Sequence, residues 1–202
     1  MRPIDKTQIV SYLKTLANEI LNAAIHYRLY KDLNQSIPEY QDVMNVTPTF
    51  WNLTLNSHLT AARSALYRAY DFAAEGTNLP RLLAHIEDHV SIDPKEIEQD
   101  RRLVARDEPL IERNRWQRNN QFAHLNFENT QNQTVTQAKS ITYGELETLI
   151  DRAFNILNKY SQYIRKGEWE RQIVSHDDYK HVLAAIKRDW AEQTSIEEKE
   201  HP

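Results

Sequence analysis

The sequence predicts an all-α fold, an antiparallel helical bundle with extra helices at both ends. Apolar residues recur at three- and four-residue steps over long stretches, which is the spacing of one helix face. Capping residues and prolines stand where these stretches begin. No segment resembles a pair of strands or a hairpin turn. These patterns predict a single domain over residues 1–202, with its core at about residues 45–165.

Two long helices are predicted in the N-terminal part of the chain. The first covers residues 6–31 and carries an apolar stripe: Ile9, Leu13, Leu16, Ile20 and Tyr27. We expect the turn-rich stretch KDLNQSIPEY to end it. Thr47 and Pro48 then begin a second helix, since a hydroxyl cap followed by proline is typical of helix starts. Its seam for packing is Leu55, Leu59, Ala62, Leu66, Ala69 and Ala73, and Gly76 is expected to end it.

Shorter helices are predicted in the middle of the chain. One covers residues 80–89, and a second begins at a cap on Asp93 and continues to about Arg106. The stretch Asp107-Glu108-Pro109 breaks that helix and starts a third, which continues into RNNQFAH at residues 118–124. The polar, aperiodic residues that follow, up to Ser140, are predicted to form a loop.

Two more helices are predicted toward the C-terminus. Thr142 and Glu145 form a capping box in front of an apolar stripe, and Gly167 is expected to end that helix. Ser175 caps the last predicted helix, over residues 176–192. The helices at 6–31 and 176–192 are therefore expected to flank the core.

The composition excludes several classes of protein. The chain has no cysteine, which excludes a disulfide framework, a thiol nucleophile and zinc sites with cysteine ligands. It has only 3 glycines, too few for a glycine-rich phosphate loop. The formal charge of −4 does not fit a general nucleic-acid binder, so any such contact must be a local patch. No apolar run is long enough for a signal peptide or a membrane span, so we expect a cytoplasmic protein without membrane contact.

The stretch RNNQFAH holds the candidate site, formed by Arg118, Asn119 and His124. Arg118 and His124 would lie about 120° apart on an ideal helix, so they could flank one groove but do not share a face. Two successive asparagines are poor helix formers, which suggests a role beyond helicity. The preceding stretch 101–118 contains six arginines and three acids, a net charge of +3. A solvated, ion-paired helix face is the alternative interpretation.

These residues resemble the signature of the HEPN superfamily, an arginine followed by a polar residue and, a few residues later, a histidine. Three segments in this order are similar to the AbiU-type branch, which is associated with abortive infection in bacteria: FWNLTLNSHLTAARSALYRAYD at 50–71, NLPRLLAHIE at 78–87 and RNRWQRNNQFAHLN at 113–126. The resemblance covers about residues 45–165. One departure is Asn126, at a position where many relatives carry an acid.

The resemblance implies a metal-independent endoribonuclease of the toxin or phage-defence type, with a HEPN-like fold and no cofactor. It implies a homodimer in which the motifs of both protomers meet. Arg118 would hold the phosphate, Asn119 would orient the reacting groups and His124 would transfer protons. The neighbouring Arg113, Arg115 and Asn120 are expected to bind the RNA substrate. A cognate antitoxin similar to a nucleotidyltransferase is a possible further partner.

Two other pairs of residues could support a site. Asp71 either forms an intrahelical ion pair with Arg68, three residues away, or orients an active-site arginine. His85 and His89 lie four residues apart and could bind a metal ion. No third ligand is evident in the sequence, so no metal site is predicted.

A second functional class remains open beside the ribonuclease. A non-catalytic helical module that binds RNA or a protein partner could keep the same fold. The presence of Arg118, Asn119 and His124 together favours the enzyme, because a scaffold does not need all three.

Overall fold

The computed structural model describes residues 5–72, 76–119, 140–171 and 177–200, without the side chains of Lys6 and of residues 193–200. The fold is all-α, as predicted, and every element of these described ranges is a helix: α1 (Lys6–Val46), α2 (Pro48–Tyr70), α3 (Leu79–His85), the 3-10 helix η1 (Ile86–His89), α4 (Pro94–Arg106), α5 (Glu108–Gln117), α8 (Tyr143–Arg165) and α9 (Asp178–Glu200). In those ranges no helix has the length and apolar character that a membrane span requires.

The chain forms two compact units. Unit 1 consists of residues 1–25 and 60–171, and unit 2 consists of residues 26–59 and 172–202. The long helices α1 and α2 each contribute one part to each unit. The single domain over residues 1–202 therefore stays a prediction, and each unit is described by itself.

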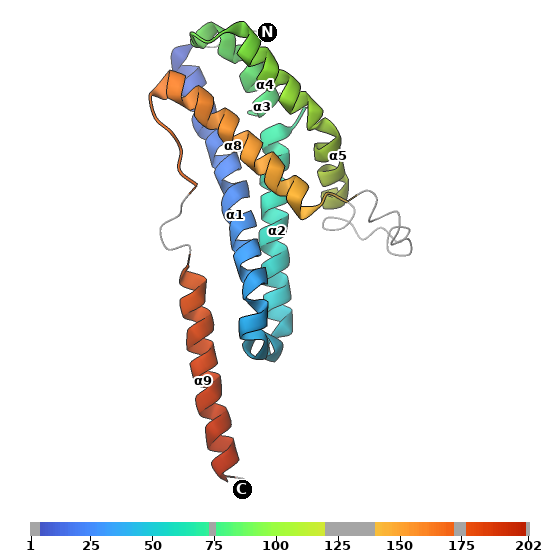
Figure 1. The fold of residues 1–202 in the computed structure, drawn as a ribbon, viewed down its shortest axis with the longest axis vertical. Helices are drawn as coiled ribbons and strands as arrows, with labels where there is room; N and C mark the ends of the chain where they lie inside the picture. Colours follow the sequence, from blue (N-terminus) through green and yellow to red (C-terminus); the bar gives the residue numbers. More distant parts are fainter. Residues whose placement is uncertain (1–4, 73–75, 120–139, 172–176, 201–202) are drawn as a thin grey trace. The chain divides into compact units, whose positions relative to one another are not determined.

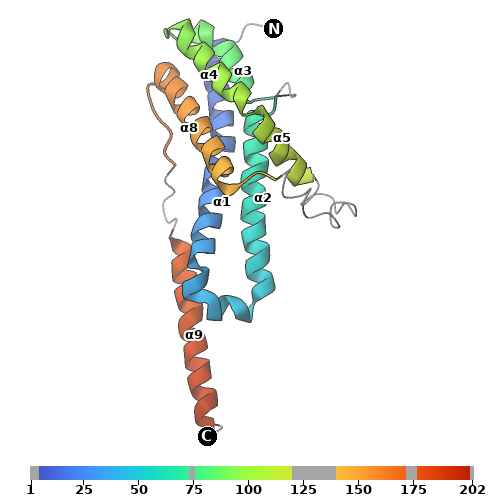
Figure 2. The same cartoon turned by 45° about the vertical axis from the view of Figure 1, so that its right-hand side comes forward.

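Unit 1 contains the helices predicted for the core. Within it, parts of α1 and α2 run antiparallel, and α8 packs with them (Figures 1 and 2). Apolar residues from each of the three predicted stripes are completely buried in this unit. They are Leu13, Leu16 and Ile20 of α1, Ala62, Leu66 and Ala69 of α2, and Leu146, Leu149 and Leu157 of α8. The predicted burial of Leu59 and Leu66 is confirmed, but the predicted α2 seam is divided: Leu55 packs against the core of unit 2, and Ala73 lies outside the described residues.

Three helices of unit 1 begin with the caps that their sequences provide. The side chain of Asn78 accepts a hydrogen bond of 2.9 Å from the backbone of Arg81, at the start of α3. Asp93 accepts one of 2.9 Å from the backbone of Lys95, at the start of α4. The predicted capping box at the start of α8 is present, because the Thr142 hydroxyl and the Glu145 carboxylate each bind the other residue's backbone. Each cap satisfies backbone N–H groups that the helix itself leaves unpaired.

A buried carboxylate connects the helices of unit 1. Asp107 lies at the corner between α4 and α5, and its residue is exposed by only 1%. Its carboxylate accepts a hydrogen bond of 3.1 Å from the hydroxyl of Tyr70 on α2 and forms an ion pair with Arg152 on α8. Burial raises the pKa of Asp107, although Arg152 and Tyr70 act in the opposite direction. This carboxylate therefore connects α2 and α8 with the corner that sets the direction of α5.

The predicted end of the first helix is wrong. The structure continues α1 through the turn-rich stretch to Val46, with Pro38 inside it and non-helical dihedrals at Tyr40 (φ −118°, ψ 23°). Tertiary packing explains the difference, because Leu33 and Met44 on this extension are buried in the core of unit 2. The first helical segment is therefore interrupted at Tyr40, the last residue of the stretch, and a second segment continues to Val46.

The predicted ends of two other helices also need correction. α2 ends at Tyr70, before Gly76, and the buried Tyr70 hydroxyl donates to the carbonyl of Leu149 at 3.1 Å. α8 ends through a left-handed residue at Lys166 (φ 55°), one position before Gly167. The turn at Lys166 brings the chain back onto α8, where the backbone N–H of Trp169 donates to the side chain of Asn158 at 2.8 Å. Packing of the returning segment thus decides which residue adopts the left-handed conformation.

Unit 2 has a small core of its own. It is formed by parts of α1 and α2 together with α9: Leu33, Met44, Trp51 and Leu183. The predicted last helix at 176–192 corresponds to α9, which starts at Asp178 and extends to Glu200. Its predicted cap, Ser175, lies outside the described residues. The amino group of Lys187 on α9 donates to the backbone carbonyl of Glu39 at 3.0 Å.

Two histidines face each other between α1 and α2 in unit 2. The Nδ1 atoms of His26 and His58 are 2.9 Å apart, and the ring centroids are 5.2 Å apart. A hydrogen bond between two ring nitrogens needs one donor and one acceptor, so at least one ring must be neutral. Burial, and to a smaller extent the charge of His26, lowers the pKa of His58.

Replacing Leu66 by Ala should lower the free energy of unfolding by about 2–5 kcal/mol, because it leaves a cavity in the core of unit 1. The side chain of Leu66 is exposed by 0%. Leu53→Ala is the matched control on the same helix, since Leu53 is exposed by 62% and should change stability by less than about 0.5 kcal/mol. Urea unfolding followed by circular dichroism measures both. Equal effects of the two substitutions would contradict the observed burial.

Stability should fall as the pH decreases below about 6.5, the pKa of an unfolded histidine. The folded pKa of His58 is lowered, so the unfolded chain takes up this proton more readily and acid favours unfolding. We expect His58→Gln to reduce the difference between urea midpoints measured at pH 7.5 and pH 5.5. His181→Gln, at an exposed position of α9, is the control and should keep the wild-type difference. An unchanged pH dependence in His58→Gln would contradict this assignment.

Candidate functional site

The candidate site begins at the C-terminal end of α5. Arg118 follows the last residue of α5 with helical dihedrals (φ −58°, ψ −47°), and Arg118 and Asn119 form a wider, π-helical turn. Such turns occur frequently at functional sites. Asn120, His124 and Asn126 lie outside the described residues. The structure therefore describes the arginine and asparagine of the predicted motif, but not its histidine.

The guanidinium group of Arg118 is held by two neighbours. Its Nε and Nη2 atoms donate hydrogen bonds of 3.1 and 3.0 Å to the side-chain oxygen of Asn119. Its Cζ atom lies 4.4 Å from the ring centroid of Tyr67, which comes from α2. Asn119 thus binds one edge of the guanidinium and Tyr67 covers one face. The Nη1 edge has no hydrogen-bond partner among the described residues.

Further charged groups surround Tyr67. Its hydroxyl lies 3.5 Å from a carboxylate oxygen of Asp71, at the limit of a hydrogen bond. Burial raises the pKa of Tyr67, and the negative charge of Asp71 adds to this effect while Arg115 and Arg118 oppose it. The phenol therefore stays neutral at physiological pH. It provides an uncharged, electron-rich ring below the guanidinium.

Buried polar side chains fix α5 beneath the site. Asn114 is exposed by 0%, and its Nδ2 atom donates to the backbone carbonyl of Arg63 on α2 at 3.0 Å. Gln117 is also buried, and its oxygen accepts a bond of 3.3 Å from the backbone of Ile141. These contacts tie α5 to α2 and to the segment before α8. The position of Arg118 over Tyr67 depends on them.

The arginines predicted to bind RNA differ in their environments. Arg113 forms an ion pair with Glu145 of the α8 capping box and donates to the carbonyl of Ser140 at 3.4 Å. Arg115 is 46% exposed and lies 3.5 Å from Glu112 on its own helix. Arg113 therefore has a structural role at the start of α8, whereas Arg115 stays near the surface. RNA binding by both remains a prediction.

Arg118 differs from most arginines of the net-positive stretch. Four of them, Arg101, Arg102, Arg113 and Arg115, form ion pairs with glutamates. In the described part of the chain no carboxylate lies within ion-pair distance of Arg118, whose side chain instead binds an amide and an aromatic ring. A guanidinium without an acidic partner keeps its charge available for a phosphate group.

Of the two supporting residues, Arg68 lies on α2, next to Tyr67 in the sequence, and Asp71 lies directly after the end of α2. Arg68 binds Glu19 of α1 through Nε at 3.0 Å and Nη2 at 2.8 Å. Asp71 follows the last residue of α2 and approaches the hydroxyl of Tyr67. Asp71 is thus placed to act on Arg118 through Tyr67, and Arg68 ties α2 to α1.

The histidine pair near α3 does not form a metal site in the described residues. His85 is buried, and burial lowers its pKa, so it is neutral at physiological pH. No group of three or more acidic or histidine side chains in the described ranges could hold a metal ion. His85 and His89 therefore remain a pair without a third described ligand.

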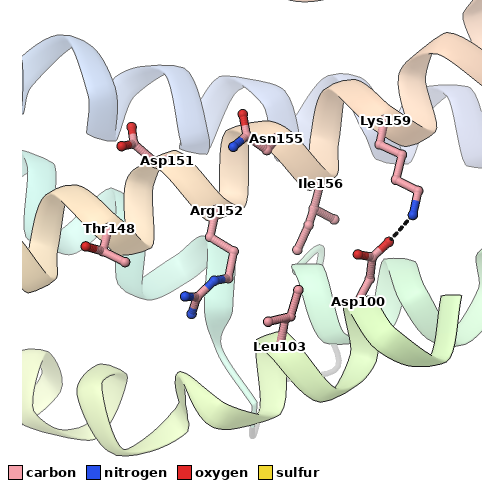
Figure 3. Close-up of a pocket in the computed structure, with 8 residues that line it drawn as sticks. All are labelled: Asp100, Leu103, Thr148, Asp151, Arg152, Asn155, Ile156 and Lys159. Atoms are coloured by element: carbon pink, nitrogen blue, oxygen red, sulfur yellow. Dashed lines mark hydrogen bonds and ion pairs between the residues drawn. The ribbon is translucent and has the colours of Figure 1, made fainter. Parts of the chain in front are cut away.

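A groove of about 370 Å³ lies between α4 and α8, away from the predicted site residues (Figure 3). Leu103 and Ile156 point into it from the facing helices, and its charged side chains are paired: Asp100 with Lys159, Arg152 with Asp107, and Asp151 with Arg171. Because these charges are compensated, the groove offers little attraction for a phosphate backbone. Arg118 is the better candidate for that contact.

Tyr67 is the residue that the sequence did not assign to the site. It lies on the polar side of α2, four residues before Asp71, and this spacing is the only signal that could have selected it. Its contact with Arg118 joins residues 51 positions apart in the chain. Only the packing of α5 against α2 brings the two side chains together.

Comparison with known families places the chain in one of them. The AbiU2 family of HEPN proteins matches residues 6–192, which is nearly the whole chain. Comparison with curated proteins and with solved structures found no match. The match agrees with the all-α fold and includes both Arg118 and Asn119. The chain therefore belongs to the AbiU2 family of HEPN proteins.

Proposed function

We propose that this protein is a metal-independent endoribonuclease of the toxin or phage-defence type, with Arg118, Asn119 and His124 as its catalytic residues. The family membership suggests a function in abortive infection. The main observation in support of the ribonuclease mechanism is the environment of the Arg118 guanidinium. Its guanidinium is oriented by Asn119 and Tyr67, and no described carboxylate neutralises it.

The chemistry requires a base, an acid and a phosphate-binding group. The 2′-hydroxyl of a ribose loses its proton to one histidine, and its oxygen forms a bond to the adjacent phosphorus. The bond from phosphorus to the 5′-oxygen breaks, and this oxygen takes a proton from a second histidine. The products are a 2′,3′-cyclic phosphate and a 5′-hydroxyl. Arg118 would stabilise the charge that develops on the phosphate oxygens, and His124 fits the proton transfers because histidine titrates near neutrality.

The proposal includes a homodimer. One chain has one copy of the motif, whereas the reaction uses a proton acceptor and a proton donor. A two-fold axis near the motif would bring two copies of His124 and two of Arg118 together. RNA is the proposed substrate, with Arg113, Arg115 and Asn120 as further contacts, and the cytoplasm the proposed location. A nucleotidyltransferase-like antitoxin is a proposed partner.

His124→Ala should reduce RNA cleavage by about 10²–10⁴, because proton transfer by a positioned side chain typically contributes that factor. Arg118→Ala should cause a loss of similar size, and Arg118→Lys should recover only part of it, since an ammonium lacks the two-pronged geometry of a guanidinium. Excess chelator should leave the wild-type rate unchanged. Arg188→Ala, at an exposed position of α9, is the control and should cleave as the wild type does. A cleavage assay with circular dichroism of each variant measures these effects.

Full cleavage by a well-folded His124→Ala protein would overturn the mechanism. Loss of activity with chelator would instead indicate a metal-dependent reaction. A wild-type protein that binds RNA or a protein partner but never cleaves RNA would favour the non-catalytic binding module.

Light scattering at micromolar concentration should give about twice the chain mass of 23.9 kDa. The reason is the second acid–base group that the reaction needs from a partner subunit. Mass should be measured for the wild type and for His124→Ala, since the substitution tests whether catalysis and assembly are separable. A strict monomer that still cleaves RNA would contradict the shared site.

A further inference from the structure

The side chain of Arg118 is more restricted than its place at a helix end requires. A guanidinium has five N–H donors in one plane. Two of them, on Nε and Nη2, point to the oxygen of Asn119 at 3.1 and 3.0 Å. The ring of Tyr67 lies against one face, with Cζ 4.4 Å from its centroid. The plane of the guanidinium and the direction of its Nη1 edge are therefore both set by neighbours.

We propose that Tyr67 is a positioning residue for Arg118, and that its ring holds the guanidinium in the orientation in which the Nη1 edge can bind an RNA phosphate. This inference rests on the proposed function, which assigns Arg118 to the phosphate. Tyr67 does not act on the substrate itself. It acts through Arg118, and Asp71 supports it from the other end of the ring.

The energetic reason is the flexibility of a free arginine side chain. Ordering such a side chain costs up to about 2 kcal/mol of rotamer entropy, which would have to be lost when the phosphate binds or reacts. An aromatic face and an amide that hold the guanidinium beforehand remove part of this cost from the reaction. Asn119 is adjacent to Arg118 in the sequence, so it moves together with the turn that carries Arg118 and cannot hold the guanidinium by itself. Tyr67 belongs to a different helix and provides a fixed reference.

The environment of Tyr67 suits this role. The ring is half-buried on α2, between the buried Leu66 and the helix end. Burial and the carboxylate of Asp71 keep the phenol neutral, so it neither loses a proton nor competes with the substrate as a negative group. The hydroxyl contact with Asp71 is long, at 3.5 Å, so the ring rather than the hydroxyl should provide most of the effect.

The test compares Tyr67→Leu, which removes the ring, with Tyr67→Phe, which removes only the hydroxyl. Tyr163→Leu is the matched control, because Tyr163 is 51% exposed on α8 in the same unit.

The first readout is the side-chain NMR signal of Arg118, which is assigned by its disappearance in Arg118→Lys. Protons above an aromatic face are shifted upfield. We expect the upfield shift of the Arg118 signal in the wild type, in Tyr67→Phe and in Tyr163→Leu. In Tyr67→Leu we expect the upfield shift to be lost and the Arg118 side chain to move faster.

The second readout is RNA cleavage by the full chain. Tyr67→Leu should lower kcat about tenfold, with a smaller change in KM, because the substrate still binds but Arg118 is less often in position. Tyr67→Phe should recover at least a third of the wild-type kcat. An Arg118 signal that is the same in Tyr67→Leu and in the wild type would overturn the inference, even if the wild type cleaves RNA. A wild type that never cleaves would overturn the proposed function, while the NMR comparison would still decide whether Tyr67 positions Arg118.

Discussion

The carboxylate of Asp107 is the group on which the arrangement of unit 1 depends. It lies at the corner between α4 and α5, accepts a hydrogen bond from Tyr70 of α2 and pairs with Arg152 of α8. An ionised group at 1% exposure is stable only with such partners. Because α5 starts at this corner, the same contact sets the direction in which α5 leads to Arg118.

The face of α5 that meets α2 carries polar side chains as well as apolar ones. Asn114 and Gln117 are buried and bind backbone groups of other segments. A buried amide with a specific partner fixes the register of two helices more narrowly than an apolar contact does. That register matters for the candidate site, since Arg118 follows Asn114 by one helical turn and has to reach Tyr67 on α2.

Electrostatics separates Arg118 from the arginines around it. Most charges of the net-positive stretch 101–118 are used in ion pairs within unit 1, including the pair of Arg113 with Glu145. The chain can therefore carry a net charge of −4 and still hold, at Arg118, a guanidinium that has no carboxylate partner among the described residues. The family match covers residues 6–192, a range that includes the whole motif.

The sequence by itself determined the helical class, most helix starts and the apolar seams, since these depend on local caps and on a period of 3.6 residues. Its pattern and a resemblance also indicated Arg118, Asn119 and His124 as the candidate site, and this assignment stays a prediction. Tertiary packing alone decided the continuation of α1 through Pro38, the left-handed turn at Lys166 and the contact of Tyr67 with Arg118. Each of these depends on atoms supplied by residues distant in the chain or on a segment that folds back, which local propensity does not encode.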